Sequence, residues 1–242
     1  MEIDCELLER YMRKFYGYGN EAAETLFIGL EEGGRETVES FATILHKWQL
    51  RGERDLEDLQ EYSRLFPDTY GYFKDPPKPQ PTWNGLIRIL LKSQGKSIAE
   101  HAVTSFQTQL LGAPNGDHCL LELMPLPARR RTDWPYAKLS RCFGYLAERD
   151  TYEREWLVLR RERICDIVRK KSRKAVVFYG TSHEYLTTWQ FIAGQPLAWD
   201  PGLKLYRSRA EKPLFVAVRH PSRYTKDEFY EGIGDFIFRV TQ

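Results

Sequence analysis

Four short runs of consecutive apolar residues predict buried β-strands. The runs cover residues 24–30, 118–123, 175–179 and 213–218, and an alternating run at 203–207 is a weaker fifth candidate. Strands that are apolar on both faces are typical of a parallel sheet covered by helices on both sides. The runs therefore indicate a sheet that lies inside the protein.

The segments between these runs repeat their apolar residues at helical spacing. Four of them stand out, near residues 38–48, 86–91, 152–170 and 229–240. Strands that alternate with helices indicate an α/β protein. We expect a three-layer α/β/α fold with a central, mostly parallel four-stranded sheet, in which ligands bind at the carboxyl ends of the strands.

The composition is ordinary for a soluble globular protein. Of the 242 residues, 42% are apolar and 29% are charged, and no apolar run approaches the roughly 20 residues that a membrane helix needs. The acidic N-terminus has no signal-peptide pattern. Because the four cysteines show no metal-ligand spacing, we expect reduced thiols in a cytoplasmic protein that binds no metal: Cys5, Cys119, Cys142 and Cys165.

Charge is unevenly distributed, although the net charge is only +2. The first 75 residues are rich in acids, whereas basic clusters follow at 129–131, 160–161, 170–174 and 204–223. Gathered on one face, these clusters would bind phosphate groups. Taken singly, each cluster is also typical of a solvated helix face.

Two segments that follow predicted strands carry candidate chemistry. Residues 29–34, Gly-Leu-Glu-Glu-Gly-Gly, place the carboxylates of Glu31 and Glu32 at a strand end, where they suit acid–base work or the stabilisation of a cation. An acidic cap for the next helix is the alternative. Residues 219–222, Arg-His-Pro-Ser, place the imidazole of His220 on a rigid turn beside hydrogen-bond donors.

In their order along the chain, these segments resemble the uracil-DNA glycosylase superfamily, and the resemblance covers most of residues 24–240. The first loop is similar to the water-activating loop, which reads Gly-Gln-Asp-Pro-Tyr-His in the best-known branch. Its Asp falls on Glu31, its Pro on Glu32 and its Tyr on Gly33. The resemblance implies a DNA N-glycosylase in which Glu31 or Glu32 activates water and His220 acts on the leaving base, with no cofactor.

Further segments extend the resemblance to base and DNA binding. Phe73, with Tyr72 in reserve, falls on the aromatic residue that stacks on the flipped base, although Phe73 is equally typical of a core. Glu122 falls at or next to the Asn that reads the base. Tyr224 falls on the wedge that fills the gap in the DNA, or else caps a helix. Residues expected to contact the DNA backbone are Pro77, Lys78, Arg129, Arg130, Arg131, Arg219, Ser222 and Arg223.

Departures from the family pattern bear on the choice of base. An ionised Glu122 can only accept hydrogen bonds, which suits the N4 amino group of cytosine. Gly33 removes the Tyr that closes the family's pocket at C5, and a helical insertion at about 35–69 could line the extra space. We therefore expect excision of a 5-modified cytosine from double-stranded DNA, such as phage DNA, by a single-domain monomer acting in antiviral defence.

Three alternatives remain open on the sequence. The same fold could excise uracil or a deaminated purine in repair. A catalytically silent module could bind unusual bases without cleaving them. An unrelated α/β hydrolase or nucleotide-binding protein is the third, although the chain has neither a Gly-Lys-Ser/Thr phosphate loop nor a Gly-x-Ser-x-Gly elbow.

Overall fold

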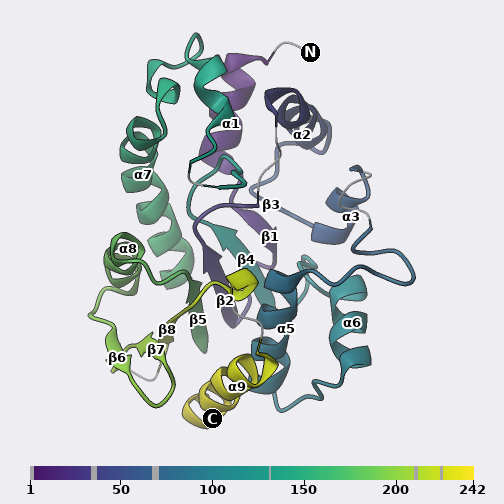
Figure 1. Ribbon diagram of the computed structural model, residues 1–242, viewed down its shortest axis with the longest axis vertical. Helices are drawn as coiled ribbons and strands as arrows, with labels where there is room; N and C mark the ends of the chain where they lie inside the picture. The colour runs from purple at the N-terminus through teal and green to yellow at the C-terminus, as the bar shows by residue number, and fades with distance from the viewer. Residues whose placement is uncertain (1–2, 34–36, 67–70, 131, 210–211, 224–225) are drawn as a thin grey trace.

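A single eight-stranded sheet forms the centre of the protein (Figure 1). The computed structural model describes residues 3–33, 37–66, 71–130, 132–209, 212–223 and 226–242. The strand order is β3-β1-β4-β2-β5-β8-β7-β6. The strands are β1 Gly17–Gly19, β2 Thr25–Gly29, β3 Leu56–Glu57, β4 His118–Glu122, β5 Ala175–Tyr179, β6 Ala198–Asp200, β7 Leu205–Arg207 and β8 Leu214–Val218.

The four apolar runs form the parallel centre of this sheet, as the sequence predicts. β2 pairs in parallel with both β4 and β5, and β5 pairs in parallel with β8. β2, β5 and β8 are buried at every position, because helices cover both faces. The expected total of four strands is wrong, since two strands extend each edge and make the sheet mixed.

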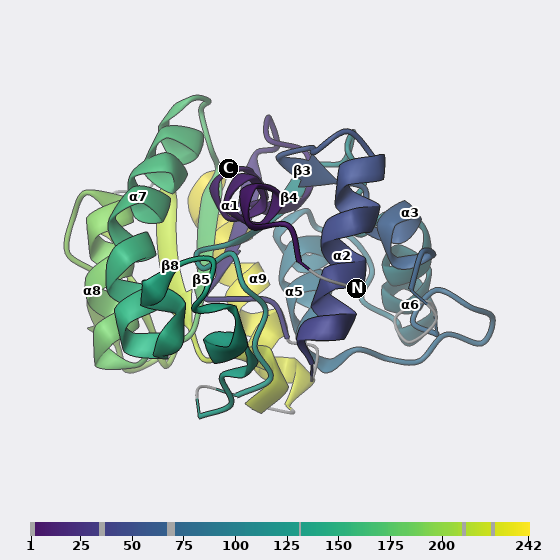
Figure 2. The ribbon, with the colours of Figure 1, turned by 90° about the horizontal axis from the view of Figure 1, so that it is seen from above.

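Helices cover the two faces of the sheet. In Figures 1 and 2, α7 and α8 lie on one side of the central strands, and α5 and α6 lie on the other, where α9 packs against α5. The helices are α1 Cys5–Lys14, α2 Val38–Leu50, α3 Leu59–Ser63, α5 Pro81–Ser93, α6 Glu100–Gln109, α7 Arg149–Arg169, α8 His183–Ala193 and α9 Asp227–Thr241, with 3₁₀ turns η1 Pro135–Leu139, η2 Gly144–Ala147 and η3 Pro221–Arg223.

The segment predicted as a helical insertion, at about 35–69, also contributes a strand. It contains α2, α3 and the short β3, which pairs in parallel with β1 at the edge of the sheet. Aromatic rings attach α2 to α1, because Tyr11 meets both Phe41 and Trp48 edge to face at centroid distances of 5.5 and 5.1 Å. The segment is therefore joined to the main core.

A buried arginine joins three of these elements. Arg160 of α7 is fully buried and donates hydrogen bonds to four backbone carbonyls. Two belong to Met12 and Phe15 at the end of α1, at 3.2 and 2.8 Å, and two to Glu122 and Leu123 at the end of β4, at 2.8 and 2.9 Å. These bonds satisfy carbonyl groups that are remote from water.

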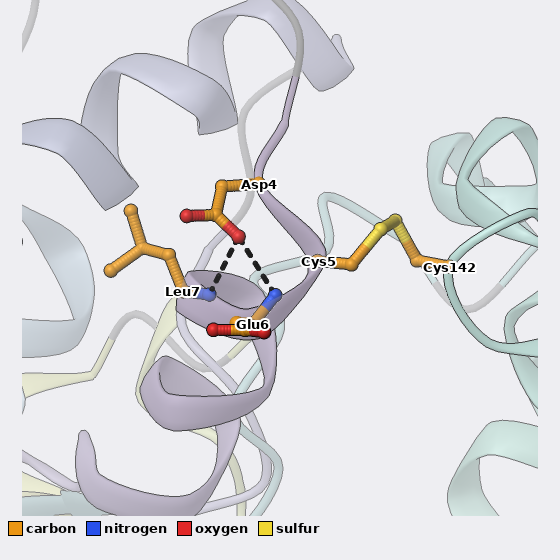
Figure 3. Close-up of a disulfide and its surroundings, with 5 residues drawn as sticks. All are labelled: Asp4, Cys5, Glu6, Leu7 and Cys142. Atoms are coloured by element: carbon orange, nitrogen blue, oxygen red, sulfur yellow. Dashed lines mark hydrogen bonds between the residues drawn. A yellow bond between two sulfur atoms is a disulfide. The ribbon is translucent and has the colours of Figure 1, made fainter.

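The cysteines differ from the expectation of four reduced thiols. Cys5, the first residue of α1, forms a disulfide with Cys142, which follows η1 (Figure 3). Asp4 caps the same helix end by accepting from the backbone N–H groups of Glu6 and Leu7. Cys119 and Cys165 are buried free thiols. Among the described helices, none combines the length and the apolar character needed to cross a membrane.

Replacing Arg160 should destabilise the fold. Arg160→Met leaves the four carbonyl groups without their donors, and we expect the free energy of unfolding to fall by roughly 3–5 kcal/mol in a denaturant titration. Arg163→Met is the control on the same helix, because Arg163 is exposed and lies 3.7 Å from Asp55. It should change stability by less than about 0.5 kcal/mol. An equal loss in both variants would contradict this role of Arg160.

Candidate active site

The carboxyl ends of the four parallel strands bring the predicted site residues together. Glu122 at the end of β4 lies in register with Gly29 at the end of β2, and Tyr179 at the end of β5 lies in register with Val218 of β8. Glu31 and Glu32 follow β2, and His220 follows β8. The location expected for a ligand site in a parallel sheet is therefore occupied by titratable side chains.

Glu31 is held by an arginine that the sequence did not single out. Nη2 of Arg149, the first residue of α7, lies 2.7 and 2.6 Å from the two carboxylate oxygens of Glu31. Nε of Arg149 also donates to Glu153 at 2.7 Å. Burial alone would lower the pKa of Arg149, but its hydrogen bonds to Glu31 raise that pKa above its ordinary value. Glu31 is consequently an oriented carboxylate beside a permanent cation.

Glu32 has a different partner. The phenol of Tyr18, on β1, donates to Oε1 of Glu32 at 2.6 Å, and burial raises the pKa of Tyr18 well above its ordinary value. The backbone carbonyl of Glu32 accepts from the N–H of Ala128 at 3.1 Å. Neither glutamate caps the next helix, because α2 begins at Val38 and Thr37 is its capping residue. The alternative of an acidic cap is therefore wrong.

Glu122 is the least well paired of the three glutamates. Its Oε1 accepts from the phenol of Tyr179 at 2.7 Å, whereas its Oε2 is buried and has no hydrogen-bond partner among the described residues. Burial raises the pKa of Glu122 to about 8, with smaller contributions from the charges of Glu32 and Glu31. A Cβ atom at Gly29 would collide with Oε2 and with the Tyr179 ring, so only glycine fits there.

His220 is held in one tautomer by its own turn. The backbone N–H of Ser222 donates to Nδ1 of His220 at 3.3 Å, and the Ser222 hydroxyl lies 2.8 Å from the same atom. Since Nδ1 accepts, the proton of the neutral imidazole is on Nε2. Burial, and then the charge of Arg223, lower the pKa of His220, so the ring is neutral at pH 7. The ring of Tyr179 packs against it at 5.5 Å.

The aromatic residues of the proline-rich segment lie beside this cluster. Phe73 is buried against Trp83 at a centroid distance of 5.5 Å, and the half-buried Tyr72 meets the same ring at 5.4 Å. Two residues further along α5, Gly85 packs on Pro221 of the His220 turn. Phe73 thus forms part of the core, as its alternative interpretation held, next to the site. Pro77 is half-buried and Lys78 is exposed.

Most predicted DNA-contacting residues lie on the surface around the strand ends. Arg129 and Arg130 are exposed beside the first loop, because Gly33 forms a bridge with Ala128. Arg219, Ser222 and Arg223 are exposed on the turn that carries His220. Among the described residues, none has an atom within 4 Å of a Cβ placed at Gly33. Arg131 and Tyr224 lie outside the described residues.

Sequence reasoning missed three residues that position the glutamates: Tyr18, Arg149 and Tyr179. The position of Tyr179 at the end of an apolar run is a signal that could have pointed to it. Arg149 gave no such signal, because it lies in a segment with many other arginines. Within the described part of the chain, no group of three His, Cys, Asp or Glu side chains is arranged to hold a metal ion.

Comparison of the chain with protein families, curated proteins and solved structures found no match. The resemblance to uracil-DNA glycosylases therefore stays a prediction that depends on the residues themselves.

The raised pKa of Glu122 predicts a pH-dependent stability difference between the wild-type protein and Glu122→Gln. Between an ordinary glutamate pKa of 4.5 and about 8, Glu122 is protonated when folded and ionised when unfolded, so rising pH destabilises the folded wild type. The amide of Glu122→Gln does not titrate. The unfolding free energy of Glu122→Gln should therefore exceed that of the wild type by an amount that grows between pH 4.5 and about pH 8. Above that range the difference should level off at roughly 2–5 kcal/mol.

Urea titrations between about pH 5 and pH 9 measure this difference. The exposed Glu155→Gln is the control, and its stability should stay parallel to that of the wild type. A constant difference between Glu122→Gln and wild type across the range would show that Glu122 is ionised in the folded protein.

Proposed function

We propose that the protein is a DNA N-glycosylase, which hydrolyses the bond between a flipped-out base and its deoxyribose. The observation that carries the proposal is the placement of an oriented carboxylate, Glu31, and a neutral imidazole, His220, after the carboxyl ends of two parallel strands of one sheet. The carboxylate suits a sugar that becomes positively charged during the reaction, and the imidazole suits a leaving base that becomes negatively charged.

In this proposal the C1′–N bond breaks, and its electron pair leaves with the base. Glu31 stabilises the oxocarbenium-like sugar and orients a water molecule, which adds to C1′ as Glu31 takes its proton. Nε2–H of His220 donates to O2 of the departing base and stabilises its negative charge. Arg149 fixes the direction of the Glu31 carboxylate and partly offsets its charge.

The proposed substrate base is a cytosine with a substituent at C5. No described residue crowds Gly33, where the family has a Tyr, and Glu122 offers hydrogen bonds to the polar edge of the ring. Cytosines of this kind occur in phage DNA, so the proposed biological role is defence against phage. The exposed Arg129, Arg130, Arg219 and Arg223 would hold the DNA backbone around the strand ends.

The direct test is incubation of the protein with duplexes that contain normal bases, uracil or a 5-modified cytosine, followed by detection of abasic sites. Abasic sites confined to the modified-cytosine duplex are the expected result. Release from the uracil duplex alone would favour a repair enzyme. Absence of abasic sites from every duplex would overturn the proposal.

Matched amide variants test which glutamate acts on the sugar. Glu31→Gln keeps the shape of the side chain but not its charge, so single-turnover cleavage should slow by roughly 100-fold or more while DNA affinity is kept. Glu32→Gln should slow cleavage by less than about tenfold, because Glu32 is assigned no contact with the sugar. The reverse order of effects would move the catalytic role to Glu32.

Salt dependence tests the proposed phosphate contacts. Loss of any one of these arginines should reduce the slope of log affinity against log salt concentration by about one unit. The variants are Arg129→Ala, Arg130→Ala, Arg219→Ala and Arg223→Ala. Lys171→Ala is the control, because Lys171 is exposed just before β5, at the opposite end of the strands. Wild-type affinity that does not change with salt would argue against a DNA partner.

A further inference from the structure

The carboxyl group of Glu122 is enclosed without a counter-ion. In the described part of the chain Glu122 forms no ion pair, and the two nearby buried guanidinium groups are committed elsewhere. Arg149 binds Glu31 and Glu153, and Arg160 gives its N–H groups to backbone carbonyls, including that of Glu122 itself. A buried carboxylate that lacks a cation is costly, and a neutral carboxylic acid costs much less.

Groups on each neighbouring element also act on this preference, some for it and some against it. The loop after β2 adds the negative charges of Glu31 and Glu32, and α7 adds the positive charge of Arg160. From β5, the phenol of Tyr179 donates to Oε1, and behind it lies His220, which is neutral at pH 7. Burial and the two negative charges favour the neutral acid, and together they outweigh the Tyr179 hydroxyl and Arg160, which favour the anion.

We propose that Glu122 is the residue that selects the base, and that it does so as a neutral carboxylic acid whose O–H lies on Oε2. The inference rests on the proposed function, and it replaces the acceptor-only role that the sequence suggests for an ionised Glu122. Tyr179 acts as a positioning residue, because its donation to Oε1 favours that oxygen as the carbonyl and leaves the proton on Oε2.

This arrangement complements the edge of cytosine. In the base-free protein Oε2 is covered and lies against Gly29, so the base pairs with it only after the groups around it shift. Oε2–H then donates to N3, which has a lone pair and no hydrogen, while Oε1 uses its second lone pair to accept from the N4 amino group. An ionised carboxylate would place a lone pair opposite the lone pair of N3. Uracil carries N3–H and O4 instead, so it needs the proton on Oε1, the oxygen that Tyr179 occupies. Glu122 and Tyr179 together would therefore prefer cytosine to uracil.

The test is single-turnover cleavage of modified-cytosine and uracil duplexes between about pH 6 and pH 10. Because the pKa of Glu122 is raised to about 8, the wild-type rate on modified cytosine should be level below that pH and fall roughly tenfold per unit above it. Glu122→Gln, whose amide also donates and accepts, should lose less than about tenfold and show no fall near pH 8. Glu122→Ala should lose 100-fold or more, since it leaves N3 and N4 unpaired.

Tyr179→Phe keeps the ring against His220 and removes only the hydroxyl. We expect its preference for modified cytosine over uracil to shrink by roughly tenfold or more, with the larger change in the uracil rate. A wild-type rate that rises through pH 8, a Glu122→Gln protein as inactive as Glu122→Ala, or an unchanged preference in Tyr179→Phe would each overturn the inference.

A measurement without DNA separates this inference from the proposed function. In protein labelled with ¹³C at glutamate carboxyl groups, the NMR signal absent from Glu122→Gln should titrate with a midpoint near pH 8. If the protein releases the base but its Glu122 titrates below pH 6, the neutral-acid role of Glu122 is wrong and the proposed function stands. No base release from any duplex at any pH would overturn the proposed function, and the base-selecting role with it.

Discussion

The four hydrogen bonds from Arg160 to backbone carbonyls are the interaction on which the arrangement of the site depends. They join the end of α1 to the end of β4 through one guanidinium, which also stacks 3.6 Å from the centre of the Tyr16 ring. Burial lowers the pKa of Arg160, and this cost is offset by carbonyl groups that would otherwise lack donors. This guanidinium bonds the backbone carbonyl of Glu122 and forms no ion pair with its carboxyl group.

Three glutamates at neighbouring strand ends consequently have three different environments. Glu31 lies against a guanidinium, and Glu32 accepts from a phenol on β1. One oxygen of Glu122 accepts from Tyr179, and the other has no hydrogen-bond partner among the described residues. Carboxyl groups of the same type can therefore divide into an oriented anion and a neutral acid within one site. Each partner comes from a different element, so the fold as a whole sets this division.

The sequence predicts the centre of the fold much better than its edges. Apolar runs located β2, β4, β5 and β8, because strands buried on both faces leave a continuous pattern. β1, β3 and β6 have only two or three residues, too few for any periodicity. The same contrast holds in the site: residues directly after strands were found, whereas Arg149 comes from a distant helix start and is specified only by tertiary packing.

Pairing of Cys5 with Cys142 was equally invisible in the sequence, since 137 positions separate the two residues. In the disulfide-bonded protein, its consequence is topological. The bond closes the first part of the chain into a covalent ring that contains Glu31 and Glu122, while Arg149, Tyr179 and His220 belong to the open tail that follows it. The ring alone holds two strands of the parallel centre, and the tail supplies the other two. The candidate site is therefore formed jointly by the ring and the tail, and it is complete only once the tail has folded onto the ring.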